Sequence, residues 1–169
     1  MKNDPSILIV EDDVDQLDML VHFVSSEVKA ILNDEEIPKH QREKLKTFNI
    51  MKVSEMKSLQ QAVEFTNNVI VTLLDCNIPD RKGIAPEDQF KKDDKQLITG
   101  QHHAVDLIAQ HLPDTPITLI SSMRRFQKTI TRFYESNSDL KLKFISKDDG
   151  TKIREDVRNH LLKYVEDNS

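Results

Sequence analysis

Short apolar runs separated by longer amphipathic segments form the main pattern along the chain. Five runs have the length of a strand, and they occupy residues 7–10, 50–53, 69–74, 117–120 and 142–145. Three of them, ILIV, VIVTLL and ITLI, are almost entirely apolar. Such continuity is typical of parallel strands that are covered on both faces. The pattern therefore predicts a parallel sheet with these three strands at its centre.

The segments between the runs have the periodicity of helices. Apolar residues recur at helical spacing over residues 17–31 and 153–165, more weakly over 59–65 and 104–112, and at Phe126, Ile130 and Phe133. Strand and helix thus alternate five times. Parallel strands need crossover connections, and right-handed crossovers place helices on both faces of a sheet. We therefore expect an α/β protein built as a three-layer sandwich.

Two stretches are longer than this plan needs. Residues 33–49 and 84–99 are charged and mixed in sign, whereas connections in compact α/β domains usually take only about 2 to 6 residues. Each insertion is either a partly helical addition or a mobile functional loop, and the sequence does not decide between these two. The 169 residues otherwise fit a single domain spanning positions 1–169.

Composition and charge exclude several classes of function. Lys and Arg number 24 against 29 Asp and Glu, so the formal net charge of -5 gives no reason to expect a nucleic-acid partner or a membrane contact. No apolar run approaches the roughly 20 residues of a membrane span, and the N-terminus lacks the features of a signal peptide. The single cysteine, Cys76, excludes an intramolecular disulfide and a multi-cysteine zinc site. We expect a cytoplasmic protein.

Polar side chains gather where the predicted strands end. The residues concerned are Glu11, Asp12 and Asp13 after the first strand, Asp75 and Asn77 after the third, Ser121 and Ser122 after the fourth, and Ser146 and Lys147 after the fifth. In open parallel sheets, ligands bind outside the carboxyl ends of the strands. Any one of these residues can serve as a turn former or helix cap, and Asp13 is expected to cap the next helix. Several carboxylates together repel one another, however, and a hard dication relieves that repulsion.

Four sequence segments resemble the receiver domain of response regulators, in the same order and on the same strands. They are ILIVEDD, LLDCNIPDRKG, PITLISS and KFISK. The strongest element is the pattern D-x-N-x-P-x-x-x-G from Asp75 to Gly83, at the spacing familiar from chemotaxis-type single-domain receivers. The resemblance covers the chain apart from the two insertions. It implies a flavodoxin-like (βα)5 fold with a five-stranded parallel sheet in the order 2-1-3-4-5.

The resemblance also implies a role for each matching residue. Asp75 is the expected phosphoacceptor, Lys147 the phosphate-binding lysine, and Mg²⁺ the cofactor, held by Glu11, Asp12, Asp75 and the backbone carbonyl of Asn77. Magnesium prefers oxygen ligands and keeps several waters, so this donor set is sufficient. The metal and Lys147 neutralise charge on the phosphoryl group, which is how phosphoryl transfer is mostly assisted.

A switch is implied as well, with one departure from the family pattern. Ser121 matches the switch Ser or Thr, and Phe144 matches the switch aromatic. Most receivers follow the lysine with a proline through a cis bond, whereas this chain has Asp148. A cis bond before a non-proline residue costs about 3 to 4 kcal/mol, so we expect a trans peptide and a differently shaped loop. This departure puts the signalling surface near Phe144 in doubt.

The predicted function is a phosphoacceptor response regulator of a two-component phosphorelay, with no enzymatic activity beyond its own phosphorylation and dephosphorylation. Its expected partners are a histidine kinase or histidine phosphotransfer protein and a downstream target protein, since the chain leaves no room for a DNA-binding output domain. An alternative is a receiver-like interaction module that phosphorylation does not control. A haloacid-dehalogenase type phosphatase fits less well, because that family expects Asp-x-Asp near the first strand.

Overall fold

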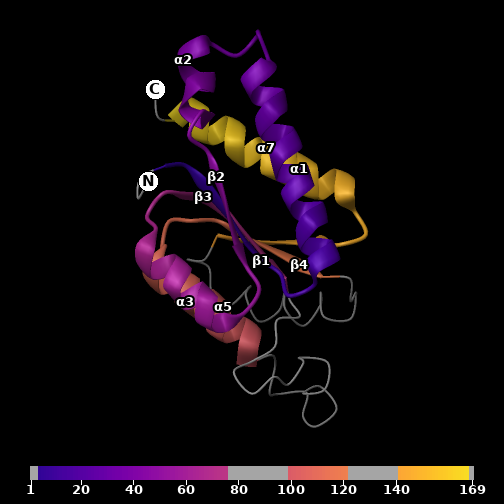
Figure 1. Cartoon of the computed structure of the whole chain (residues 1–169), viewed down its shortest axis with the longest axis vertical. Coiled ribbons are helices and arrows are strands. Elements are labelled where there is room, and N and C mark those ends of the chain that lie inside the picture. Colours follow the sequence, from indigo (N-terminus) through magenta and orange to yellow (C-terminus); the bar gives the residue numbers. More distant parts are fainter. Residues whose placement is uncertain (1–3, 76–98, 122–140, 168–169) are drawn as a thin grey trace.

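The computed structural model of the chain describes residues 4–75, 99–121 and 141–167, the side chains of residues 99–103 excepted. A sheet of five parallel strands lies at its centre (Figure 1). The strands are β1 (Ser6–Val10), β2 (Asn49–Val53), β3 (Val69–Asp75), β4 (Ile117–Ser121) and β5 (Leu142–Ser146). Their order in the sheet is β2-β1-β3-β4-β5, which confirms the predicted flavodoxin-like topology.

Helices cover both faces of the sheet, so the predicted three-layer sandwich is confirmed. Figure 1 shows α1 (Val14–Asn33) and α7 (Gly150–Asp167) on one face, and α3 (Met56–Phe65) and α5 (Thr99–His111) on the other. Every residue of β1, β3 and β4 is buried, because helices cover the side chains on both faces of these strands. The helix predicted around Phe126 and Phe133 lies outside the described residues.

The alternation of side chains along each strand divides the interior into two cores. In β1, Leu8 and Val10 pack with the α3 and α5 layer, whereas Ile7 and Ile9 pack with the α1 and α7 layer. Among the described residues, no helix is long and apolar enough to cross a membrane.

The start of α1 is fixed directly behind β1. Asp13 is its N-cap, as predicted, and its Oδ1 atom accepts a hydrogen bond of 2.9 Å from the Gln16 backbone N–H. This cap confines the turn between β1 and α1 to a few residues. Glu11 and Asp12 are therefore held at the carboxyl edge of the sheet.

The insertion at residues 33–49 is partly helical and packs against the ends of two long helices. It contains α2 (Lys39–Arg42) and the 3-10 helix η1 (Glu43–Leu45). The Arg42 guanidinium donates to the Leu32 carbonyl at 3.0 Å, and Lys44 Nζ donates to the Val165 carbonyl at 2.6 Å. Both carbonyls belong to last helical turns, which lack intrahelical donors and attract cations. Of the second insertion, residues 84–98 lie outside the described residues.

A buried carboxylate joins α7 to the edge of the sheet. The Asp156 side chain is 4% exposed, and its Oδ2 atom accepts a hydrogen bond of 2.7 Å from the Thr118 hydroxyl of β4. Its Oδ1 atom accepts a hydrogen bond of 2.9 Å from Lys143 Nζ of β5. One side chain thereby ties α7 to two strands.

Removing this carboxylate should weaken the fold. Asp156→Ala leaves the buried Thr118 hydroxyl without its acceptor and breaks the ion pair with Lys143, so we expect a loss of about 1 to 3 kcal/mol in the free energy of unfolding. Urea denaturation of the variant measures this loss. Glu155→Ala changes an exposed carboxylate on the same helix and is the matched control. Equal stabilities of the two variants would show that the Asp156 contacts do not hold α7.

Candidate functional site

Three carboxylates meet at the carboxyl edge of the sheet. Glu11 and Asp12 follow β1, and Asp75 is the last residue of the neighbouring strand β3. One oxygen atom from each side chain lies within 4.8 Å of the others. Glu11 and Asp75 are buried, whereas Asp12 is exposed. The predicted convergence of these three residues is confirmed.

The Glu11 side chain is held by the start of α1. Its Oε1 atom accepts a hydrogen bond of 3.1 Å from the Asp13 backbone N–H. The Glu11 backbone N–H donates to the Val53 carbonyl at 2.9 Å, which extends the pairing of β1 with β2 by one step. Hydrogen bonds therefore hold both the backbone and the side chain of Glu11 in place.

Lys147 places a partly buried cation between two of the acids. Its backbone N–H donates to the Ser121 carbonyl at 3.0 Å, which holds the residue at the end of β5. Its Nζ atom lies 2.7 Å from Glu11 Oε2 and 3.1 Å from Asp75 Oδ1. The resemblance assigned Lys147 to the phosphoryl group only. The ion pair with Glu11 was not predicted.

The charges of the site do not balance when all of its groups are ionised. Burial, followed by repulsion from the Glu11 carboxylate, raises the pKa of Asp75 to about 7, although Lys147 acts in the opposite direction. Burial disfavours the charged Lys147 ammonium, but attraction to Asp75 and Glu11 exceeds that cost and raises the pKa of Lys147. A single ammonium therefore leaves Asp75 short of the positive charge that would keep it ionised.

The donor set fits a hard dication. Glu11 Oε2 and Asp75 Oδ1 are buried and accept no hydrogen bond with good geometry among the described residues, although Lys147 lies beside both. All three side chains offer oxygen, the ligand that Mg²⁺ prefers, and the exposed Asp12 leaves an open side for water. Glu11, Asp12 and Asp75 are thus able to hold Mg²⁺. Asn77, whose carbonyl was predicted as a further ligand, lies outside the described residues.

The two predicted switch residues lie on adjacent strands. Ser121 ends β4 and is 4% exposed. Phe144 lies within β5, where it pairs in register with Leu119 and is half-buried against the core beneath α3 and α5. Ser121 is thus next to the acidic site, whereas Phe144 lies two residues before the carboxyl end of β5.

In the loop after Lys147, Asp148 and Asp149 make hydrogen bonds at the place where most receivers have a proline. The Asp148 N–H, a group that proline lacks, donates a weak hydrogen bond of 3.4 Å to Ser146 Oγ. Asp149 Oδ1 then accepts a hydrogen bond of 3.1 Å from the Lys152 N–H at the start of α7. A short turn that caps the following helix therefore replaces the proline.

The raised pKa of Asp75 predicts a stability that depends on pH. Between the ordinary pKa of 3.8 and about 7, the folded protein keeps a proton that the unfolded chain has lost, so rising pH disfavours folding across this window. Asp75→Asn removes the effect. In EDTA we expect this variant to be more stable than the wild type above about pH 7, by on the order of 1 to 3 kcal/mol, and the difference to vanish below about pH 4.

Chemical denaturation at a series of pH values measures this difference. Asp18→Asn, which alters an exposed carboxylate on α1, is the control and should follow the wild type. A lower stability of Asp75→Asn at every pH would mean that the Asp75 carboxylate makes net favourable bonds in the metal-free fold.

Comparison with known proteins places this geometry in a recognised fold. No protein-family model and no curated protein matches the chain. Solved structures do match. The bacteriophytochrome response regulator AtBRR is 15% identical with a TM-score of 0.57, and the match covers 93% of this chain and 91% of that one. A signal receiver domain from an HD-domain protein of Pseudomonas fluorescens is 14% identical with a TM-score of 0.57, covering 99% and 93%.

An adenylate cyclase structure from Rhodopirellula baltica is equally similar, at 12% identity and a TM-score of 0.57, with 98% of this chain and 94% of that chain covered. Likeness at such identities concerns the arrangement of the backbone and not the activity. The chain has the fold of response-regulator receiver domains.

Proposed function

We propose that the protein is a phosphoacceptor response regulator of a two-component phosphorelay, phosphorylated on Asp75 in a reaction that requires Mg²⁺. The observation that carries the proposal is the meeting of Glu11, Asp12 and Asp75 around one point, with the Lys147 ammonium beside two of them. A structural salt bridge needs only one acid for one base. The excess of carboxylates supports a site that receives further positive charge.

The chemistry follows from these positions. A carboxylate oxygen of Asp75 attacks the phosphorus of a phosphohistidine; an O–P bond forms, the N–P bond breaks, and the imidazole leaves with its electron pair and takes up a proton. Asp75 must be ionised to attack, and a pKa of about 7 leaves much of it protonated at neutral pH without a metal. Bound Mg²⁺ supplies the charge that favours the ionised form and that neutralises the phosphoryl oxygens.

Lys147 supports the product of this transfer. Its ammonium is 3.1 Å from Asp75 Oδ1 and is held by Glu11, so it lies within reach of a phosphoryl oxygen on Asp75. A charge-assisted contact there would replace part of the present ion pair. The protein in this proposal catalyses at most its own phosphorylation and dephosphorylation.

The partners follow from the same proposal. The donor is a histidine kinase or a histidine phosphotransfer protein, and the signal passes to a downstream protein in the cytoplasm. The alternative is an interaction module that phosphorylation does not control. This alternative leaves the cluster of Glu11, Asp75 and Lys147 without a function. A test of phosphorylation on Asp75 distinguishes the phosphoacceptor from the interaction module.

Phosphorylation should occur on Asp75 alone. After incubation with acetyl phosphate and magnesium, we expect the intact mass of the wild type to increase by one phosphoryl group, and Asp75→Asn or added EDTA to abolish the increase. Asp18→Asn, with its exposed carboxylate changed, should be labelled as the wild type is. An undiminished mass gain in Asp75→Asn would rule out Asp75 as the acceptor, and no gain in the wild type would favour the alternative.

Readout of the phosphoryl group should depend on Ser121. An aspartyl phosphate adds acceptor oxygens beside β4, and the Ser121 hydroxyl can donate to one of them by moving inward. Phe144 has no hydroxyl, so turning it inward leaves no hydrogen-bonding group unsatisfied. The phosphoryl group then shifts an existing equilibrium between the outward and inward packings of Phe144. We expect Ser121→Ala to be phosphorylated and yet to lose most of the amide NMR shifts that beryllofluoride produces in β4 and β5.

Ser54→Ala is the matched control, because Ser54 is an exposed serine that follows β2, at the opposite edge of the sheet from β5. It should respond to beryllofluoride as the wild type does. A full response in Ser121→Ala would show that the signal runs by another route.

A further inference from the structure

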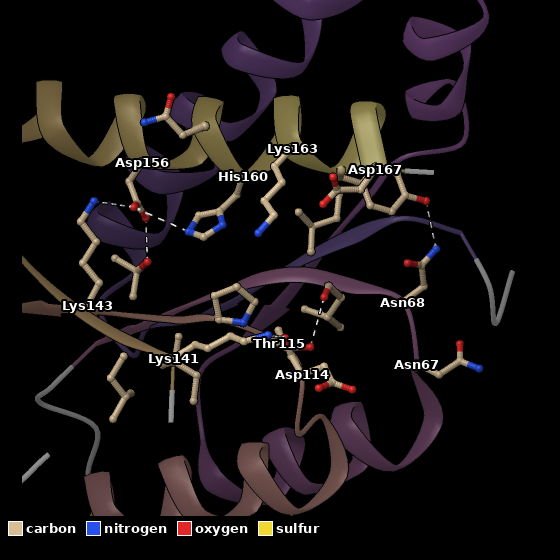
Figure 2. A pocket seen from close by; sticks show the side chains of 18 residues that line it. Asn67, Asn68, Asp114, Thr115, Lys141, Lys143, Asp156, His160, Lys163 and Asp167 are labelled. Carbon is tan, nitrogen blue, oxygen red and sulfur yellow. Dashed lines mark hydrogen bonds and ion pairs between the residues drawn. The ribbon is translucent and has the colours of Figure 1, made fainter. Parts of the chain in front are cut away.

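A polar pocket lies at the edge of the sheet opposite to Asp75. It has a volume of about 740 Å³, within the range of roughly 300 to 1,000 Å³ that small-molecule sites occupy. The first residues of β3, β4 and β5 form one wall, and the last turns of α7 form the other (Figure 2). No residue of the acidic site lines it.

One end of the pocket is a network around the buried Asp156 carboxylate, in which Lys143 is exposed and His160 is partly buried. The Asp156 carboxylate accepts hydrogen bonds from Thr118 and Lys143, and its Oδ1 atom lies 3.6 Å from His160 Nε2. Burial lowers the pKa of His160; the Asp156 carboxylate opposes this shift, and Lys143 and Lys163 reinforce it. The imidazole is therefore mostly neutral at neutral pH. Asp156 and Lys143 already form an ion pair with each other, so we do not assign them to a ligand.

The ammonium groups of two lysines in the middle of the pocket, Lys141 and Lys163, are able to bind an anion. The Lys163 side chain makes no hydrogen bond or ion pair with the part of the chain that the structure describes, and Figure 2 shows it extending from α7 toward the strands. Among the described residues, Lys141 Nζ donates to the Asp114 backbone carbonyl alone, at 3.3 Å. Two ammonium groups thus enter one pocket from opposite walls, and neither pairs with a carboxylate of residues 4–75, 104–121 or 141–167.

The rest of the lining argues for a small ligand over a macromolecule. Figure 2 shows Asp114 and Asp167 at the end of the pocket near Asn67 and Asn68, away from Asp156. Three lysines and three aspartates line the pocket, so its formal charge is balanced, and the whole chain carries -5. Nucleic acids and acidic protein surfaces need an extended basic face. Here the positive charge is local.

We propose that this pocket binds a small molecule through a carboxylate or phosphate group placed between Lys141 and Lys163. The buried Asp156 network holds the adjoining end of the pocket in place. Asp114 and the two asparagines at the other end offer hydrogen-bond acceptors to hydroxyl or amino groups of the same ligand. The site is separate from Asp75 and does not depend on the proposed phosphorylation.

NMR signals of the His160 imidazole provide the test, since this ring lies inside the pocket. The full chain is titrated with sodium phosphate and, separately, with sodium malonate, in EDTA near neutral pH; sodium chloride at equal ionic strength is the reference. We expect a saturable shift of His160 and none of His22, an exposed residue on α1. Saturation with phosphate alone identifies a phosphate site, and saturation with malonate alone identifies a carboxylate site.

Two variants assign the binding to the pocket. Lys163→Gln should weaken it by roughly tenfold, whereas Lys152→Gln, which alters an exposed lysine of α7 outside the pocket, should leave the midpoint unchanged. Asp75→Asn should also bind normally. A shift of His160 that is linear or that chloride reproduces would overturn the proposal, and so would an equal loss of binding in Lys163→Gln and Lys152→Gln.

Discussion

The buried contact of Lys147 with Glu11 and Asp75 is the interaction on which the site depends. Each of the three groups comes from a different strand end, so the contact exists only if β1, β3 and β5 lie in parallel and in register. Removing charges from water is costly, and here one ammonium contacts two buried carboxylates while a third, exposed carboxylate lies close to both acids. Asp75 keeps its proton to an unusually high pH as a result. A site with this deficit of positive charge is poised to accept a dication, and the proposed function rests on that property.

Helix α7 connects the two edges of the sheet. Its start is capped by Asp149, two residues after Lys147, and its last turns border the pocket that contains Lys163. Between these ends, Asp156 binds β4 and β5, while Arg154 binds Glu27 of α1 at 3.0 Å. The insertion at residues 33–49 adds Lys44 at the carboxyl end of the same helix. The position of α7 is thus fixed by polar contacts as well as by its apolar stripe, and a change in β4 or β5 would reach it through Asp156.

The sequence predicted the strands well, because strands buried on both faces are mostly apolar, and ILIV, VIVTLL and ITLI contain only Thr72 and Thr118 as polar residues. It also indicated the acidic site, since parallel topology brings strand ends together. It did not decide the form of residues 33–49, because α2 and η1 are too short to be stable alone and depend on contacts of Arg42 and Lys44 with distant carbonyls. The role of Asp156 was missed although a signal existed: it lies three residues after Ile153 and one before Val157, on the apolar stripe of its helix. The ion pair of Lys147 with Glu11 left no such signal, since it depends on the exact path of the chain after β5.

The titration of the Asp75 side-chain carboxyl shows directly whether the metal-free site lacks positive charge and whether magnesium supplies it. Carbon NMR of protein labelled at aspartate carboxyls, assigned with Asp75→Asn, gives its midpoint in EDTA and again with saturating magnesium. We expect a midpoint of about 7 without metal, because of burial and of repulsion from Glu11, and a much lower midpoint once magnesium is bound. A midpoint near the ordinary value of 3.8 in EDTA, unchanged by magnesium, would contradict this expectation.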